Sequence, residues 1–416
     1  SQLTFIEILF INMKRFTQLP IYIFFYIMMC DNIYASSDEE LWNLSSPESK
    51  GINSIVLKEL HNEFKNSEHG YIDSFLVIKD GDIVFEKHYQ VDYFEITKDS
   101  KHEQAKIMQK NYGTLAKPQY NYFNPDWHPF YKDTNLHTIQ SVSKSVTSAL
   151  IGIAIERGAI DSLETKIIDF FPQYKHLFND EMKRSITIRD LLTMTAGIKW
   201  DEFSYAYTDP LNDAATMENS HDWVEYILSL PMEHQPGSKF VYNSGITILL
   251  SHVLQKATKM QVEKYAEKYL FRPLGIQNYY WKKTPTGLTD TEGGLYLSSR
   301  DFAKIGLLYL NDGVWNDQQI LREEWVKLTM SPDILIEGSN RKYGFQWWFI
   351  PFPSDHSNPY KDGEEKWIFS GSGYGGQYLL VIPEHDLVVV FNGWNVFDIP
   401  RPTIEYLSKR VLKSIY

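Results

Sequence analysis

The sequence predicts an α+β fold in which one antiparallel sheet of about five strands, built from both ends of the chain, is flanked by helices and interrupted by a mostly helical insertion. Three observations predict this fold class. A hairpin signal lies near residue 80, helical patterns dominate the middle of the chain, and apolar strand-like stretches follow residue 343. With 416 residues, 43% of them hydrophobic, the chain can also bury a substantial core.

The first elements are a helix and a hairpin. Residues 54–66 place apolar side chains at helical spacing behind a serine cap. Two apolar runs, 75–78 and 83–85, flank Asp80-Gly81, a dipeptide typical of tight hairpins. Residues 91–136 are rich in Lys, Asn, Tyr and Asp without sustained periodicity, so we expect a long surface connection there.

Helical patterns fill the middle of the chain, and strand patterns return near its end. Residues 198–222, with Tyr205 and Tyr207, interrupt the helices as a loop of the kind that often walls a pocket. We expect the sheet region to comprise 54–155 and 290–416, and the helical region 156–289. The expected helices are 187–194, 246–260, 262–270, 298–310 and 403–413, and the later strands are 343–348, 367–369, 378–382 and 387–391.

The stretch that follows Met13 is typical of a signal peptide. Two basic residues precede the apolar run 21–29, and Ala35 offers a small side chain for cleavage. We therefore expect residues 1–35 to be a signal peptide, with Met13 as the true translation start. The apolar run 21–29 is too short for a comfortable membrane span. The mature protein would be exported, periplasmic or secreted, with no membrane span.

Composition narrows the chemistry of the expected mature domain, residues 36–416. The only cysteine, Cys30, lies in the leader, so the domain has no thiolate, disulfide or cysteine metal ligand. Tethering through an uncleaved leader or a lipid on Cys30 is the alternative to full release. The 12 histidines show no metal spacing, so we expect no metal and no cofactor. A net charge of -12 makes nucleic acid a poor partner, and the oligomeric state stays open.

The pair Ser141 and Lys144 carries the strongest chemical signal. Both lie at the start of an apolar run that predicts a largely buried helix beginning near Ser141, and residues three apart on a helix share a face. The lysine amine can therefore reach the serine oxygen, while the N–H groups of a helix N-terminus favour an oxyanion there. This pattern predicts a serine nucleophile.

A serine hydroxyl needs a base, and two groups could serve. Burial would lower the pKa of Lys144, whereas a neighbouring phenolate would raise it, so a tyrosine could share the proton. The best candidate is Tyr242, which lies between a Pro236-Gly237 turn and a long apolar helix. The alternative interpretation of Tyr242 is a tyrosine that only packs in the core, and that of Ser141 is a serine that only caps the helix.

Several further stretches, together with Ser141-x-x-Lys144, resemble the penicillin-recognising serine hydrolases of class C β-lactamase type. This family includes β-lactamases, D-alanyl peptidases, esterases and aminohexanoate-oligomer hydrolases, and the likeness covers essentially the whole mature chain. It implies the β-lactamase/transpeptidase-like fold. The stretches are the Asp80-Gly81 hairpin, LLTMTAG at 191–197, GGLYLSSRD at 293–301 and GGQ at 375–377.

The resemblance also implies roles for individual residues. Ser141 would be acylated, Lys144 would be its partner, and Tyr242 would be the general base that later protonates the leaving group. The backbone N–H groups of Ser141 and Tyr374, the latter on the strand after Gly373, would form the oxyanion hole. Ser244 would assist as a polar group, and Tyr205 or Tyr207 could contact the substrate, although packing is the preferred interpretation of both.

Two departures from the family pattern bear on the substrate. The Tyr-x-Asn motif becomes Tyr242-Asn243-Ser244, and the Lys-Thr-Gly motif falls on residues 371–373, Gly-Ser-Gly, without a cation. A charge-assisted hydrogen bond to a substrate carboxylate is worth about 1.5–3 kcal/mol. We therefore expect a hydrolase of small esters or linear amides, as in the esterase and 6-aminohexanoate-oligomer hydrolase branch. A β-lactamase or D-alanyl carboxypeptidase, and a non-catalytic binding protein of the same fold, are the alternatives.

Overall fold

The computed structural model describes residues 42–115, 129–332, 334–353, 366–396 and 399–416. The chain divides into two units, 1–44 and 45–416, and the described helices and strands belong to the second. The predicted leader and Cys30 lie outside the described residues. None of the helices within the described ranges combines the length and apolar character that a bilayer crossing requires.

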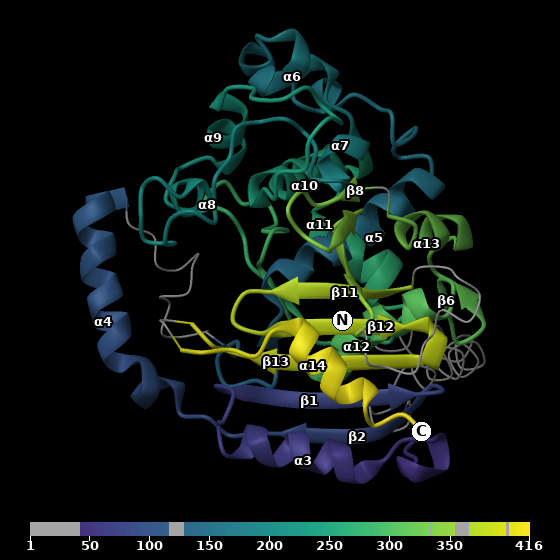
Figure 1. Ribbon diagram of the computed structural model, residues 1–416. Coiled ribbons are helices and arrows are strands. Elements are labelled where there is room, and N and C mark those ends of the chain that lie inside the picture. Colours follow the sequence, from purple (N-terminus) through teal and green to yellow (C-terminus); the bar gives the residue numbers. More distant parts are fainter. Residues whose placement is uncertain (1–41, 116–128, 333, 354–365, 397–398) are drawn as a thin grey trace, which may run out of the picture. The chain divides into compact units, whose positions relative to one another are not determined.

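An eight-stranded antiparallel sheet forms the centre of the second unit (Figure 1), in the order β2-β1-β13-β12-β11-β10-β9-β8. The first hairpin pairs with the last strand, with Phe75 opposite Phe391 and Val77 opposite Val389. The predicted assembly of one sheet from both chain ends is therefore confirmed, although the sheet has eight strands and not about five. The strands are β1 (Ile72–Lys79), β2 (Asp82–His88), β8 (Ile334–Leu335), β9 (Lys342–Gly344), β10 (Trp347–Pro351), β11 (Trp367–Gly373), β12 (Gln377–Ile382) and β13 (Leu387–Gly393).

Both faces of this sheet are buried, which explains why β12 and β13 carry apolar side chains on both faces. Leu380 and Val389 face the core shared with α3 (Ser54–Lys65) and α14 (Ile404–Leu412). Their neighbours Leu379 and Val388 face α12 (Ser299–Leu310) at Gly306, where an added Cβ would lie 2.9 Å from each. In Figure 1, α14 accordingly lies in front of the strands and α12 behind them.

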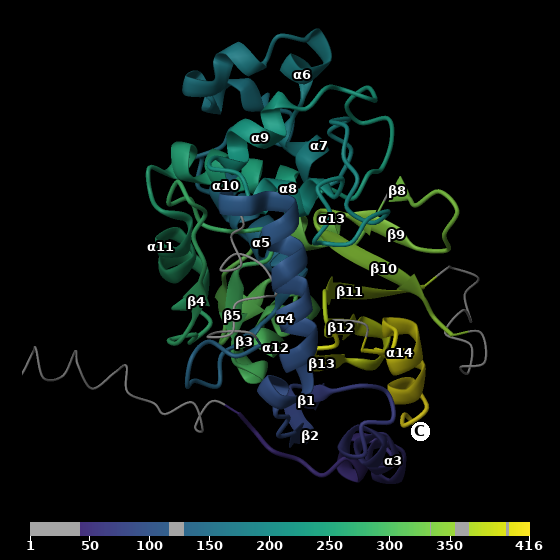
Figure 2. The same ribbon diagram turned by 90° about the vertical axis from the view of Figure 1, so that its left-hand side faces the viewer.

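The helical region lies beyond the β11 side of the sheet, and α5 connects the two parts (Figure 2). Its helices are α5 (Ser143–Glu156), α6 (Glu181–Ser185), α7 (Ile188–Leu192), α8 (Asp213–Glu218), α9 (Trp223–Ser229), α10 (Ser244–Thr258), α11 (Val262–Ala266) with the π turn η7 (Glu267–Phe271), and α13 (Glu323–Thr329). Short 3-10 turns are η1 (Glu48–Lys50), η2 (Gly113–Leu115), η4 (Gln140–Val142), η5 (Ile167–Phe170), η6 (Pro172–Leu177) and η8 (Pro383–His385). Small sheets pair β3 (His137–Thr138) with β5 (Leu295–Leu297) and β5 with β4 (Tyr280–Trp281), and β6 (Val314–Trp315) with β7 (Gln318–Gln319).

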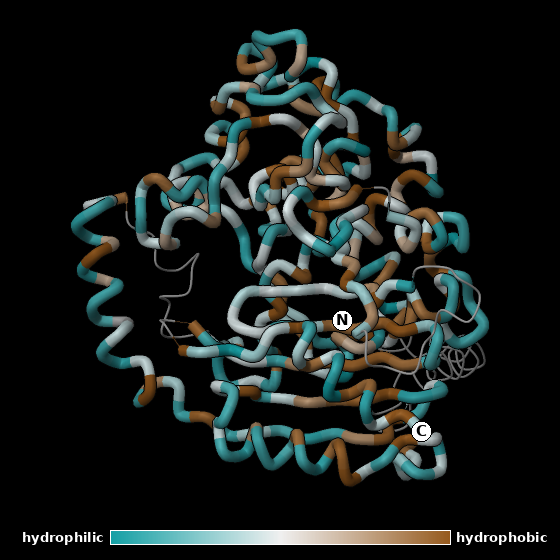
Figure 3. The backbone as a smooth tube through the Cα atoms, viewed as in Figure 1, coloured by the Kyte–Doolittle hydropathy of each residue, from teal (hydrophilic) through white to brown (hydrophobic). Residues whose placement is uncertain are grey.

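Helix α4 (Tyr93–Tyr112) contradicts the surface connection expected over 91–136. Asp92 caps it by accepting a hydrogen bond from the N–H of Glu95. The helix is mostly hydrophilic (Figure 3), because it bridges the sheet and the helical region with only a few buried contacts. Its far end is held by Tyr112, whose hydroxyl donates to the carbonyl of Asp209 at 3.1 Å. A helix of this kind carries little hydrophobic periodicity, so the sequence pattern does not reveal it.

The stretch 343–348, expected to be one strand, is instead a hairpin of β9 and β10. Trp347 pairs with Gly344, so the turn consists of Phe345 and Gln346 alone, with φ values of 50° and 67°. Such a turn normally contains Gly or Asn. Here buried hydrogen bonds hold Gln346: its amide nitrogen donates to the carbonyl of Leu191 at 2.8 Å, and its amide oxygen accepts from Thr247 at 2.9 Å.

Candidate active site

Ser141 lies in η4, the 3-10 turn between β3 and α5, and not in the α-helix itself, which begins at Ser143. The preceding residue, Gln140, has a φ of 46°, an unusual value for a residue with a side chain. Its amide nitrogen donates to the hydroxyl of Thr138 at 3.0 Å, which holds the turn. This sharp turn leaves Ser141 partly exposed at the start of a buried helix.

The amine of Lys144 lies against the Ser141 hydroxyl, with an Nζ–Oγ distance of 2.9 Å. The lysine side chain is almost fully buried, and the same amine donates to the backbone carbonyl of Glu292 at 2.6 Å and lies 3.4 Å from its carboxylate. The predicted meeting of the serine and the lysine is thus present in the structure. These contacts hold the Lys144 amine in position for proton exchange with the Ser141 hydroxyl.

Tyr242 reaches the same place from the start of α10. The LLTMTAG stretch positions it: the N–H of Val241 donates to the carbonyl of Met194 at 2.9 Å. The Tyr242 phenol lies near both Ser141 and Lys144, and the lysine nitrogen lies 5.4 Å from the centroid of its ring. The structure therefore brings Ser141, Lys144 and Tyr242 together from two distant parts of the chain.

Aromatic side chains enclose Tyr242 and keep its ring in one orientation. Phe203 stacks on it at a centroid distance of 5.3 Å, and Trp348 stacks at 5.5 Å. Tyr343 meets the ring edge-on at 6.2 Å. Such packing excludes water around the phenol, which strengthens electrostatic interactions with the nearby amine.

The surroundings favour the protonated forms of both proton carriers. Burial by itself lowers the pKa of Lys144, but Tyr242 and the carboxylates of Glu292 and Glu202 outweigh it, and the lysine pKa is raised. Burial raises the pKa of Tyr242 more than Lys144 lowers it. The resting site accordingly holds an ammonium and a neutral phenol. The sequence analysis names burial and a neighbouring tyrosine as the two opposing influences on the lysine pKa, and the structure adds the two carboxylates.

Strand β11 lies directly against the turn that carries Ser141. An added Cβ on Gly371 would lie 2.5 Å from a methyl group of Val142, and one on Gly373 would lie 2.5 Å from the carbonyl oxygen of Ile139. Glycine is therefore required at both positions for this close approach. Tyr374 follows Gly373 in the hairpin turn between β11 and β12, and not on a strand.

Asn243 and Ser244, which follow Tyr242 in place of the family's x-Asn, both serve the start of α10. Asn243 caps α10 by accepting from the N–H of Ile246 at 3.1 Å, so its side chain is used by the helix. Ser244 turns to Glu202, to which its hydroxyl donates at 3.0 Å and its N–H at 2.8 Å. Burial raises the pKa of Glu202, although Lys144 and these hydrogen bonds act against it.

The two loop tyrosines occupy different environments. Tyr207 lies beside Tyr374, with ring centroids 5.5 Å apart, and its hydroxyl donates to Glu202 at 3.5 Å. Both rings pack on the cluster formed by Tyr93, Trp394 and Val396. Tyr205 is 41% exposed, and within the described part of the chain its side chain makes no hydrogen bond or ring contact with Ser141, Lys144 or Tyr242. The structure thus brings Tyr207, but not Tyr205, to the candidate site.

Sequence analysis missed a buried group of acidic residues next to Lys144. It comprises Glu202, Glu218, Asp290 and Glu292, each at most 8% exposed. The only available signal was the acidic residue directly before the GGLYLSSRD stretch. No arrangement of three or more potential ligands suited to a metal ion occurs among the described residues.

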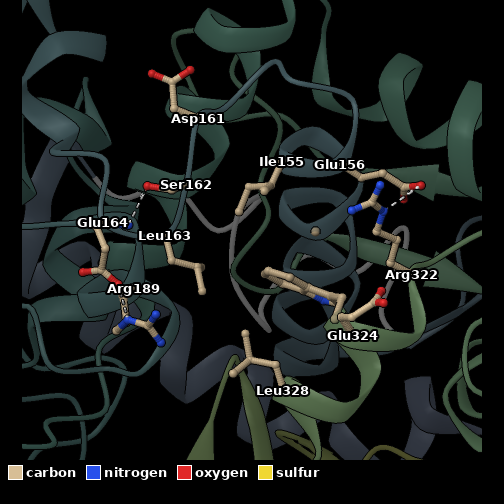
Figure 4. A pocket seen from close by; sticks show the side chains of 12 residues that line it. Ile155, Glu156, Asp161, Ser162, Leu163, Glu164, Arg189, Arg322, Glu324 and Leu328 are labelled. Carbon is tan, nitrogen blue, oxygen red and sulfur yellow. Dashed lines mark hydrogen bonds and ion pairs between the residues drawn. The ribbon is translucent and has the colours of Figure 1, made fainter.

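Besides the candidate active site, the structure has a cavity of about 400 Å³ that contains none of the predicted site residues; it is called the second cavity below. Figure 4 shows the two arginines at its rim paired with glutamates: Arg189 with Glu164 at 2.7 Å, and Arg322 with Glu156 at 3.4 Å. These charges neutralise one another in pairs. The cavity is lined by Gly152, Ile155, Glu156, Asp161, Ser162, Leu163, Glu164, Arg189, Arg322, Glu324, Trp325 and Leu328.

Comparisons with known proteins agree with this geometry. The sequence matches the 6-aminohexanoate-dimer hydrolase of Paenarthrobacter ureafaciens with 24% identity over 268 residues, which cover 61% of this chain and 65% of that protein. The chain thus spans less than two thirds of that relative. The fold is similar to that of a family VIII carboxylesterase (TM-score 0.58, 13% identity, 90% of this chain and 98% of the other). It is also similar to that of a penicillin-binding protein from Bacillus halodurans (TM-score 0.55, 18% identity, 86% and 99%).

The family described as Beta-lactamase matches residues 72–395. This range includes Ser141, Lys144, Tyr242 and the Gly371–Gly373 segment, together with all the strands that carry them. Because the match covers more than half of the chain, the chain belongs to the Beta-lactamase family of serine hydrolases.

Proposed function

We propose that this protein hydrolyses small uncharged carboxylic esters or linear amides through an acyl-enzyme on Ser141. The observation that carries the proposal is the 2.9 Å contact between the Lys144 amine and the Ser141 hydroxyl, in a buried site that also holds the Tyr242 phenol. A nucleophile with two proton carriers in contact is the arrangement that acyl transfer requires.

In the proposed reaction, the Lys144–Tyr242 pair first gives up one proton to water. The Ser141 oxygen then attacks the substrate carbonyl carbon while its proton passes to the pair. The N–H groups of Ser141 and Tyr374 would stabilise the oxyanion. As the tetrahedral intermediate collapses, the pair returns the proton to the leaving alcohol or amine. Water then attacks the acyl-enzyme, loses a proton to the same pair, and releases the carboxylic acid and the free serine.

The charges around the site support a substrate without a carboxylate. Gly371 occupies the position of the family's lysine, and a methyl group of Val142 fills the space beside it. Two carboxylates, Glu202 and Glu292, contribute instead to the field at Lys144. We therefore rank esters and linear amides without a carboxylate above β-lactams and D-alanyl peptides.

Purified protein and a small set of substrates test the proposal. We expect hydrolysis of a short-chain p-nitrophenyl ester or of an uncharged short-chain p-nitroanilide, lost in Ser141→Ala, with kcat/KM well above that for nitrocefin or a D-alanyl-D-alanine peptide. Preferential turnover of nitrocefin would replace the ester proposal with a β-lactamase. If none of the substrates is cleaved and a fluorophosphonate leaves no adduct on Ser141, a non-catalytic binding protein is the correct reading.

We further propose, from the sequence alone, that the protein is exported after cleavage behind Ala35. Expression of the full chain, followed by cell fractionation and mass measurement of the mature N-terminus, tests this proposal. An intact leader in the cytoplasmic fraction would contradict it.

A further inference from the structure

The acidic residues behind Lys144 form a connected group. Glu292 lies directly before the GGLYLSSRD stretch, and its carboxylate is 3.4 Å from the Lys144 amine. Glu218, at the end of α8, is buried beside the Glu292 carboxyl group. Asp290, two residues before Glu292, lies 3.7 Å from the amine of Lys282. Carboxyl groups from two separate segments, 290–292 and the end of α8, are therefore neighbours, and that of Glu292 reaches the buried Lys144 amine.

Charge balance decides which of these groups carry protons. Two ammonium groups, Lys144 and Lys282, face four buried carboxyl groups, and an excess of buried negative charge is costly. Burial and the neighbouring Glu292 raise the pKa of Glu218 well above its ordinary value, and they raise that of Asp290 to about 7. Glu218 accordingly favours its protonated form, next to the Glu292 carboxyl group that lies 3.4 Å from the Lys144 amine.

We propose that Glu292 is a positioning residue for the reaction: its backbone carbonyl, 2.6 Å from the Lys144 amine, and its carboxylate, 3.4 Å away, hold that amine against Ser141 and oppose the loss of its proton. This inference rests on the proposed function, because it concerns the proton that must leave the Lys144–Tyr242 pair before the pair can accept one from Ser141. Glu292 does not touch the reacting atoms. Its effect reaches Ser141 through Lys144.

Other charged or titratable groups also face this pair and must be held constant in any test. Lys144 faces Tyr242 and Glu202 as well as Glu292. Glu292 faces Tyr207 in addition to Glu218 and Asp290. The substitution Glu292→Gln changes one charge and leaves all of these in place. It also keeps the backbone carbonyl that accepts from Lys144 at 2.6 Å, so the amine retains its position.

The experiment measures the rate at which a fluorophosphonate labels Ser141 as a function of pH, with adduct formation followed by intact mass. In the unsubstituted protein, the rate should rise from neutral into alkaline pH as the Lys144–Tyr242 pair loses a proton. In Glu292→Gln, this alkaline limb should move to lower pH by at least about one unit, because a full negative charge next to the amine is removed. Thermal melting confirms that the variant is folded.

Two further variants sharpen the result. Glu164→Gln makes the same chemical change at the rim of the second cavity and should leave the limb in place. In Glu218→Gln, the amide can still donate to Glu292, so the limb should move by less than half of the shift in Glu292→Gln. If Glu292→Gln labels more slowly at every pH with an unmoved limb, the residue is structural and the inference is wrong. If the unsubstituted protein is not labelled at all, the proposed function itself fails.

Discussion

Replacing Gly371 with alanine should displace the turn that carries Ser141. The new Cβ would lie 2.5 Å from one methyl group of Val142 and 3.3 Å from the other, and Val142 is fully buried, so it cannot move away freely. Overpacking of this kind costs about 1–3 kcal/mol of folding stability. A displacement of the nucleophile by about 1 Å can cost on the order of 100-fold in rate. We therefore expect kcat/KM for a p-nitrophenyl ester to fall by roughly 10- to 100-fold.

The double variant Gly371→Ala/Val142→Ala separates this steric effect from a general loss of stability. Removing the two methyl groups costs about 2 kcal/mol by itself, but it opens the space that the new Cβ needs. The double variant should therefore recover at least about tenfold in kcat/KM over Gly371→Ala. Gly344→Ala is a matched control, because its Cβ would meet only Pro332 at 3.6 Å. If Gly371→Ala keeps its activity and its melting temperature, the close contact between β11 and the Ser141 turn does not constrain the site.

Three further predictions concern protons and buried hydrogen bonds. Because the pKa values of Lys144 and Tyr242 are both raised, kcat/KM of the ester reaction should increase as the pH rises from neutral into the alkaline range, and a flat profile would contradict the assignment. Gln346→Ala should lower the free energy of unfolding by about 2–4 kcal/mol in urea, since it leaves buried partners such as the Leu191 carbonyl unpaired, whereas an unchanged midpoint would refute that role. The pKa of Asp290 is raised from 3.8 to about 7, so the folded state binds this proton more tightly than the unfolded state and loses that stability as the pH rises through 7. Relative to Asp290→Asn, the unsubstituted protein should therefore lose up to about 4 kcal/mol of unfolding free energy between about pH 4 and pH 8, and a constant difference would contradict the shift.

The sequence predicts those parts of the fold whose causes are local. The hairpin at Asp80-Gly81 and the apolar strands of β12 and β13 follow from turn chemistry and burial on both faces. The helix α12 follows from its Ser298 cap, whose hydroxyl accepts from the N–H of Asp301 at 3.1 Å. At the first helix the cap is Asn53 and not Ser54, a shift of one residue that propensity alone does not resolve.

Features that depend on tertiary contacts were not predictable in this way. Helix α4 has little apolar periodicity because it bridges two parts of the fold. The turn at Phe345-Gln346 is held by buried hydrogen bonds from distant helices, and no Gly or Asn marks it. Ser141 lies in a 3-10 turn because β3 and β11 bend the chain just before α5.

The candidate site likewise contains residues that the sequence identifies and residues that it does not. Ser141, Lys144 and Tyr242 have recognisable spacing and neighbours, so the sequence identifies them. Glu202 and Glu292 act through their position in space, since each lies in a loop that becomes part of the site only when the chain folds. The pKa of Lys144 is raised by Tyr242, which the sequence identifies, and further by these two carboxylates, which it does not.

Mass analysis of Ser141 after reaction with a fluorophosphonate tests the central claim most directly. The account predicts a single adduct on the peptide that contains Ser141, formed rapidly in the unsubstituted protein, at least about 100-fold more slowly in Lys144→Met, and not in Ser141→Ala. An adduct on another residue, or equal labelling in the presence and absence of the Lys144 amine, would contradict it.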